Sequence, residues 1–147
     1  MPAAGPPLLR IAALLGACAM LAACSGLGSP ESRAGLSCID DSPECVQQRQ
    51  ATLKAMLAEQ DRGWVKEPAT IEAHASGVRL FAFRSKKAEL SCEELAHGRR
   101  EAEGAPKALK GGTAQGLSPA QIARASAFAT EVGRELAGEM RKRRCRA

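Results

Sequence analysis

A continuous amphipathic pattern near the end of the chain is the feature that most constrains its fold. From Ser118 onward, apolar side chains recur every three or four residues, which places them within an arc of about 120° on a helix. The members of this stripe are Ile122, Ala125, Phe128, Ala129, Val132, Leu136 and Met140. Ser118, Pro119 and Gln121 together form a typical helix start. We therefore predict one long helix from residue 118 to about residue 143, whose apolar face must pack against other helices.

Two further helices have recognisable starts. Ser42 is a good N-cap and Pro43 fits the first helical position, so we expect a helix that begins there and ends near residue 60. Ser91 and Glu94 match a capping box. The helix that they begin is expected to end around residues 104–106, where Gly104 and Pro106 interrupt it, before a Gly-rich loop at residues 110–116.

The segment from residue 68 to about residue 87 fits two structures. Its apolar residues repeat at helical spacing, but residues 78–83 would also suit a short buried strand. We favour a helix, because its neighbours are helical and no partner strand is evident, although Gly77 within it costs about 1 kcal/mol relative to Ala. The expected fold class is all-α: a small four-helix up-down bundle with short connections.

The beginning of the chain has the anatomy of a secretion signal. A single positive charge at Arg10 is followed by an apolar run, residues 11–23, which is shorter than the roughly 20 residues that span a membrane. The run ends in Leu21-Ala22-Ala23-Cys24, which resembles the lipobox of bacterial lipoproteins. The alternative interpretation is an ordinary secretory signal followed by an incidental Cys.

The resemblance to bacterial lipoproteins implies a role for each of these residues. Leu21, Ala22 and Ala23 would be recognised by the lipoprotein signal peptidase, and the thiol of Cys24 would carry diacylglycerol, with its new amino group usually acylated by a fatty acid such as palmitate. Residues 1–23 would be the removed signal peptide. Ser25 after the lipidated Cys, rather than Asp, implies the outer membrane facing the periplasm, with the inner membrane or a Gram-positive surface left open.

The remaining chain divides into two parts. Residues 24–37 comprise the lipidated N-terminus and a tether rich in Gly, Ser and Pro, a composition typical of a flexible segment. Residues 38–147 are expected to form the helical domain with a basic C-terminal tail. Aromatic residues make up only 3% of the chain. A core built mostly from small aliphatic side chains buries little area, so such a domain gains from disulfides.

Four cysteines follow the lipobox: Cys38, Cys45, Cys92 and Cys145. An even number in an exported chain predicts two disulfides, with three connectivities. An up-down bundle would place Cys45, Cys92 and Cys145 at the same end. This arrangement favours Cys38–Cys45 with Cys92–Cys145, and the crossed pairings stay open. The spacings are unlike those of zinc ribbons or fingers, so no metal site is predicted.

No catalytic residue or cofactor site is identified. His74 and His97 lie in different expected helices, without the spacing to a carboxylate that marks a catalytic or metal site, so we expect surface or core roles. Adjacent Glu93 and Glu94 are explained by the favourable charge at a helix start. Trp64 is expected in the core or at the end of the bundle.

The last residues form the most unusual charged cluster, with five basic side chains in six positions: Arg141, Lys142, Arg143, Arg144 and Arg146. Only Arg10 of the 21 basic residues precedes Cys24, so 20 basic and 16 acidic residues remain, a net charge of +4. A nucleic-acid partner would suit this charge but not the export signal. If the tail, the cysteines and the tether share one end of the domain, the tail could contact anionic lipid headgroups; the alternative is a solvated tail.

These features predict a lipid-anchored protein of the cell envelope with a structural or protein-binding role. Its expected partners are the membrane, through the lipid anchor, and an envelope protein that it binds, but no nucleic acid. The chain resembles the small uncharacterised envelope lipoproteins of GC-rich proteobacteria. We do not expect an enzyme. The alternative is a periplasmic inhibitor or a small-ligand-binding module, for which Trp64 and residues 104–117 would be the first candidates.

Overall fold

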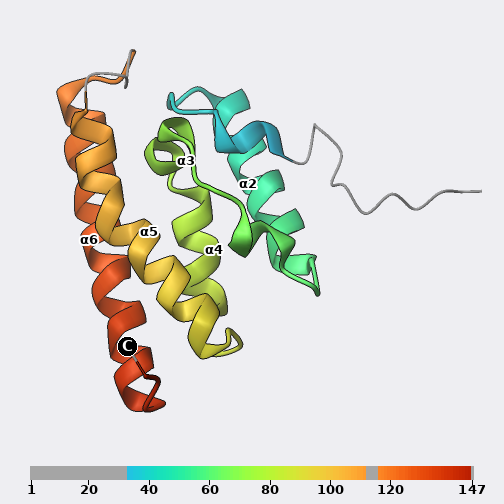
Figure 1. Cartoon of the computed structure of the whole chain (residues 1–147). Helices are drawn as coiled ribbons and strands as arrows, with labels where there is room; N and C mark the ends of the chain where they lie inside the picture. The colour runs from blue at the N-terminus through green and yellow to red at the C-terminus, as the bar shows by residue number, and fades with distance from the viewer. Residues whose placement is uncertain (1–32, 112–115, 147) are drawn as a thin grey trace, which may run out of the picture.

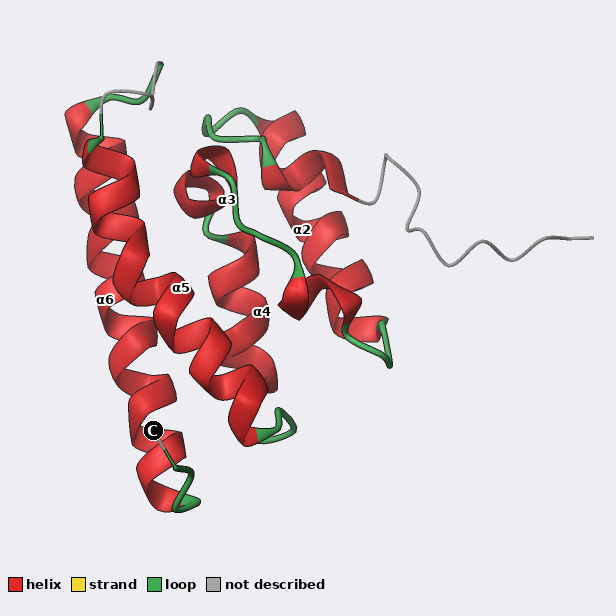
Figure 2. Ribbon diagram, viewed as in Figure 1, coloured by secondary structure: helices red, strands yellow, loops and turns green. Residues whose placement is uncertain are grey.

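The computed structural model describes residues 33–111 and 116–146, and every regular element within these ranges is a helix (Figure 2). In chain order, with η marking a short 3-10 helix, the elements are η1 (Ala34–Leu36), α2 (Pro43–Ala58), η2 (Gly63–Lys66), α3 (Ile71–Ser76), α4 (Val78–Lys86), α5 (Cys92–Lys110) and α6 (Pro119–Lys142). The predicted all-α class is therefore confirmed, and so is its stapling by two disulfides.

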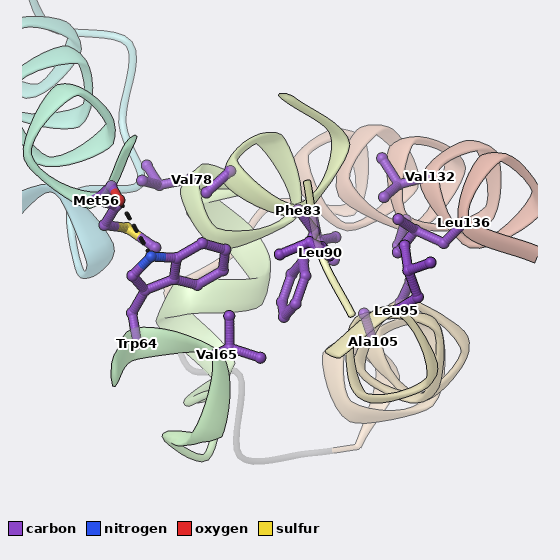
Figure 3. Close-up of a cluster of buried hydrophobic side chains, with 14 of the residues drawn as sticks. Met56, Trp64, Val65, Val78, Phe83, Leu90, Leu95, Ala105, Val132 and Leu136 are labelled. Carbon is purple, nitrogen blue, oxygen red and sulfur yellow. Dashed lines mark hydrogen bonds between the residues drawn. The ribbon is translucent and has the colours of Figure 1, made fainter. Parts of the chain in front are cut away.

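Helix α4 occupies the centre of the domain, between α2 on one side and the long antiparallel pair α5 and α6 on the other (Figure 1). Leu80, Ala82 and Phe83 on this helix have no exposed surface. The ring of Trp64 packs edge-on against Phe83, with 4.8 Å between centroids, and its Nε1 donates a hydrogen bond of 3.1 Å to the carbonyl of Met56 (Figure 3). The few large side chains thus gather around α4, where they bury the most area.

The three predicted helix starts are confirmed by their caps. Ser42, Ser91 and Ser118 each accept a hydrogen bond from the backbone N–H three residues later, at 3.1–3.2 Å. In the two capping boxes, the side chains of Glu94 and Gln121 accept in return from the backbone N–H of the cap residue. These contacts are local in sequence, which is why the sequence alone predicts them.

The segment expected as one helix over residues 68–87 is instead two helices, α3 and α4, joined at Gly77. This glycine has φ of +69°, in the left-handed region, and it ends α3 as it begins α4. Glycine adopts this conformation without the steric penalty that a Cβ brings. The chain therefore turns at Gly77 instead of continuing one helix past it, and the alternative of a strand at residues 78–83 is wrong.

The end expected for the third helix, near residues 104–106, is also wrong, because α5 continues through Pro106 to Lys110. Ala105 and Leu109, on either side of this proline, are 0% and 1% exposed. Pro106 cannot donate a backbone hydrogen bond within the helix. Burial of this face along α6 offsets that loss.

The chain directions differ from a simple up-down order in one place, because α2 and α4 run the same way (Figure 1). Asp41, just before α2, pairs with Arg124 in the first turns of α6, at 3.2 Å. Arg62, just after α2, pairs with Glu94 at the start of α5, at 2.9 Å. Residues 59–70 therefore return along the length of the domain before α3 begins.

Residues 59–70, which we call the return connection, are held in place by the buried guanidinium of Arg79. The side chain of Arg79 is 2% exposed. It donates hydrogen bonds to the carbonyls of Trp64 and Glu67, at 2.7 and 2.8 Å. It also binds both carboxylate oxygens of Glu101 on α5, at 2.9 and 2.6 Å. A buried charge is tolerated only when it is paired and hydrogen-bonded, and here both conditions are met.

Residues 34–36 (η1), which the sequence assigns to the tether, pack against α2 in the structure. Gly35 lies so close to α2 that a Cβ at this position would come within 2.5 Å of the carbonyl oxygen of Gln48. The backbone N–H of Gly35 donates to the hydroxyl of buried Thr52, at 3.0 Å. Residues 33–37 of the expected tether are therefore packed on the domain.

Two glycines of α5 allow a matched test of this packing. A Cβ at Gly98 would lie 2.5 Å from Cδ1 of Phe83, a core ring that cannot move away, whereas a Cβ at Gly104 would meet nothing within 4 Å. We expect Gly98→Ala to lower the free energy of unfolding by about 1–3 kcal/mol through overpacking. Gly104→Ala should raise it by about 0.5–1 kcal/mol through helix propensity. Urea unfolding monitored by circular dichroism measures both, and equal shifts of the same sign would contradict this packing.

Candidate functional site

The predicted lipidation site lies outside the described residues. Cys24 and the recognition residues Leu21, Ala22 and Ala23 all belong to residues that the structure does not describe. So do residues 112–115, the middle of the Gly-rich loop that was expected at residues 110–116. The remaining predicted site residues are all placed.

The disulfides are Cys38–Cys45 and Cys92–Cys145, each with 5.4 Å between Cα atoms. This is the favoured pairing, but the reason given for it is wrong, because the two bonds lie at opposite ends of the domain. The first is beside the start of α6, and the second joins the start of α5 to the chain just beyond α6. The return of residues 59–70 removes Cys45 from the end that Cys92 occupies.

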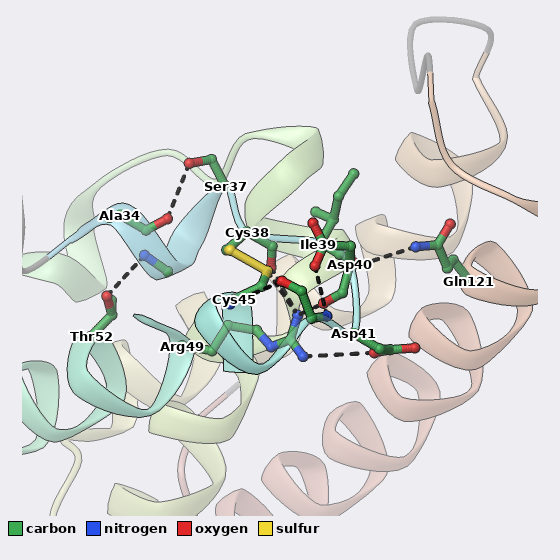
Figure 4. Close-up of a disulfide and its surroundings, with 12 residues drawn as sticks. Ala34, Ser37, Cys38, Ile39, Asp40, Asp41, Cys45, Arg49, Thr52 and Gln121 are labelled. Carbon is green, nitrogen blue, oxygen red and sulfur yellow. Dashed lines mark hydrogen bonds and ion pairs between the residues drawn. A yellow bond between two sulfur atoms is a disulfide. The ribbon is translucent and has the colours of Figure 1, made fainter. Parts of the chain in front are cut away.

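The Cys38–Cys45 loop is fastened to two helices (Figure 4). The guanidinium of Arg49 on α2 donates to the carbonyls of Cys38 and Asp40, at 3.1 and 2.6 Å. The side-chain amide of Gln121 on α6 donates to the carbonyl of Ile39, at 3.0 Å. These hydrogen bonds, together with the disulfide, hold the backbone of residues 38–40 in place against α2 and α6.

The basic tail lies at the other end, beside Cys92. Its arginines and Lys142 are exposed, although the guanidinium of Arg143 donates to the carbonyl of Leu90 and Lys142 pairs with Glu139 at 3.8 Å. Helix α6, about 36 Å long at 1.5 Å per residue, separates the tail from the Cys38–Cys45 end. The expectation that tail, cysteines and tether share one end is therefore wrong, and with it goes the geometric argument for a tail against the membrane.

An aromatic surface lies near the Cys38–Cys45 end. Phe81 is 47% exposed. Among residues 33–111 and 116–146, it is the one large hydrophobic residue that is exposed to solvent. Its ring contacts that of Phe128 on α6, with centroids 4.5 Å apart. Two hollows adjoin it, of about 220 and 280 Å³. We call this surface the Phe81 groove; besides Phe81 and Phe128, its apolar lining comprises Ile39, Val46, Leu53, Ala75, Val78 and Ala125.

Neither Trp64 nor the acidic pair belongs to this surface. Trp64 is 2% exposed and forms part of the core, as expected. Glu94 completes the capping box of α5 and binds Arg62 at 2.9 and 3.2 Å. Trp64 therefore does not offer a binding face for a ligand.

The two histidines, which the sequence places far apart, line one cleft of about 370 Å³ between α3 and α5. His74 is 8% exposed, and burial lowers its pKa below the ordinary value, with Glu101 opposing and Arg79 reinforcing the shift. His97 stacks on Phe83, with 6.5 Å between centroids. Glu101 lines the same cleft, one helical turn after His97. Sequence reasoning missed this grouping because the packing of α3 on α5 leaves no local signal.

No group of three His, Cys, Asp or Glu side chains in residues 33–111 and 116–146 is arranged to hold a metal ion. Across the same residues, none of the helices combines the length and the apolar character needed to cross a membrane. The chain matches no protein-family model, and comparison with curated proteins and with solved structures finds no similar protein.

The burial of His74 predicts how stability depends on pH. Its pKa in the folded protein is below the ordinary value of 6.5, so the unfolded chain binds the proton more readily. The free energy of unfolding should therefore fall as the pH drops from about 7.5 to 5.5, and His74→Gln should flatten this part of the profile. Glu135, whose pKa the hydrogen bond from Lys87 lowers, acts only at lower pH. Urea unfolding across this pH range measures the slope, and an unchanged slope in the variant would refute the assignment to His74.

Proposed function

We propose that this protein is a lipid-anchored lipoprotein of the bacterial cell envelope, held on the outer membrane facing the periplasm, whose helical domain binds another envelope protein. The observation that carries the proposal is the sequence Leu21-Ala22-Ala23-Cys24 at the end of an apolar run, with its likeness to a lipobox. No catalytic reaction is part of the proposal.

The anchor follows from the chemistry of Cys24. A thioether to diacylglycerol and an acylated amino group together carry two or three fatty acyl chains. Each buried CH₂ contributes about 0.8 kcal/mol, so two or more chains hold a protein stably at a membrane. Residues 25–32 lie in sequence between the lipid-bearing residue and Arg33, the first residue that the structure describes.

The two disulfides support an export destination. Disulfides persist in oxidising compartments such as the bacterial periplasm and are rare in the cytosol. Both bonds join cysteines that follow the lipobox. Their presence in the folded domain fits a protein that matures outside the cytoplasm.

The Phe81 groove supports the binding role. A half-exposed aromatic ring beside apolar hollows is typical of an interaction site, because buried aromatic side chains dominate the energy of protein interfaces. Arg49, Asp41 and Arg124 lie at its edge and could pair with polar groups of a partner. The partner would insert an apolar side chain between Phe81 and the aliphatic residues of α2, Val46 and Leu53.

Lipidation is tested by metabolic labelling with radioactive palmitate in the native host. The unaltered protein should be labelled, and Cys24→Ala should lose the label and the membrane fraction, because only this thiol lies in the lipobox. Cys18→Ala is the matched control, since Cys18 lies within the same apolar run without that context. Full labelling of Cys24→Ala would refute the anchor.

The binding role is tested by placing a photo-crosslinking phenylalanine analogue at Phe81 in intact cells. We expect one discrete adduct with an envelope protein. The same analogue at Ser85, an exposed residue one turn later on α4, should give none. Once the partner is identified, Phe81→Ala should weaken its binding by about 2 kcal/mol, as for a central interface residue. No adduct, or equal adducts from both positions, would refute the role of the groove.

A further inference from the structure

The cleft between α3 and α5 has features that the proposed role does not explain. Its lining comprises Ala69, His74, His97, Arg100, Glu101, Gly104 and Ala108. Its volume of about 370 Å³ falls within the range of small-molecule sites, roughly 300–1,000 Å³. Ala69, Gly104 and Ala108 add only small side chains, so the two imidazoles, Arg100 and Glu101 determine its chemistry.

In both histidines, the Nδ1 atom is buried without a hydrogen-bond partner. His74 as a whole is 92% buried, being 8% exposed. An N–H at Nδ1 would be an unpaired buried donor, which is rare and costs about 1–3 kcal/mol. The neutral imidazoles are therefore expected to carry their proton on Nε2, the nitrogen left to interact at the cleft. Each ring then presents a hydrogen-bond donor there.

The same observation disfavours a metal ion. An imidazole that ligates a metal through Nε2 must carry its proton on Nδ1 and normally donates it to a carboxylate, a carbonyl or water. Neither Nδ1 has such an acceptor. The cleft therefore lacks the supporting hydrogen bonds of a histidine metal site.

The charges at the cleft favour an anion. Both carboxylate oxygens of Glu101 are occupied by Arg79, which neutralises them. The guanidinium of Arg100 belongs to an exposed residue that makes no ion pair with the described part of the chain. Arg100 brings up to five N–H donors in a geometry that suits carboxylate and phosphate groups. The lining thus offers donors and positive charge, with its one acidic group already paired.

We propose that this cleft is a binding site for a small soluble molecule with a carboxylate or phosphate group, which the Nε2–H groups of His74 and His97 and the guanidinium of Arg100 hold together. The site is independent of the Phe81 groove and of the lipid anchor. Arg79 takes part indirectly, by occupying the oxygens of Glu101 that would otherwise repel the anion.

The chain contains only two histidines, so two Cε1–H resonances report on the cleft by NMR. The purified protein, processed as the cell makes it and kept in a neutral detergent, is titrated separately with inorganic phosphate and with acetate; His74→Gln and His97→Gln assign the signals. We expect both resonances to shift saturably, with one dissociation constant, for at least one of the two anions. Whichever anion binds identifies the oxyanion that the site prefers.

Arg100→Gln should raise that dissociation constant about tenfold or more, since a hydrogen bond to a charged group contributes about 1.5–3 kcal/mol. Arg134→Gln is the matched control, because Arg134 is an exposed arginine on α6 that does not line this cleft. Both residues are exposed, so neither change endangers folding, which circular dichroism verifies. No saturable shift with either anion, equal weakening by the two arginine variants, or tight stoichiometric Zn²⁺ binding in place of the anions would overturn the proposal.

Discussion

The buried guanidinium of Arg79 is the interaction on which the arrangement of the domain depends. One side chain on the central helix α4 binds two backbone carbonyls of the return connection and both oxygens of Glu101 on α5. A buried ion pair adds little net stability over an apolar pair of the same shape. Its larger effect is on the path of the chain, because a path of residues 59–70 that moved the carbonyls of Trp64 and Glu67 away would leave part of the buried guanidinium without acceptors.

The short helix α3 separates the two candidate surfaces. Ala75 and Ser76 face the Phe81 groove, whereas His74 lines the cleft on the side of α5. Gly77 makes this possible, because the turn at this residue sets the direction of α3 independently of α4. A partner in the groove and an anion in the cleft would therefore contact opposite sides of the same six-residue helix.

The two disulfides reinforce different parts of a core with few large side chains. Cys38–Cys45 closes a short loop that Arg49 and Gln121 hold against α2 and α6. Cys92–Cys145 has a sequence separation of 53 and joins the start of α5 to the chain just beyond the end of α6. Closing the longer loop restricts the unfolded chain more. Because this bond holds Cys145 beside Cys92, the basic tail lies near the start of α5. It is therefore far from the Cys38–Cys45 loop at the other end of the domain.

The sequence by itself determined the all-helical class, the serine caps and the long helix α6, because capping and apolar periodicity act between residues three or four positions apart. The disulfide pairing was favoured from the sequence for a reason that the structure contradicts, so the tertiary structure decided it. Only the tertiary structure decided the break at Gly77, the passage of α5 through Pro106 and the return of residues 59–70, since each balances a local preference against burial elsewhere. The run at residues 78–83, apolar apart from Arg79, carried a signal of a central helix. The meeting of His74 with His97 carried none, because contacts between distant segments have no period in the sequence.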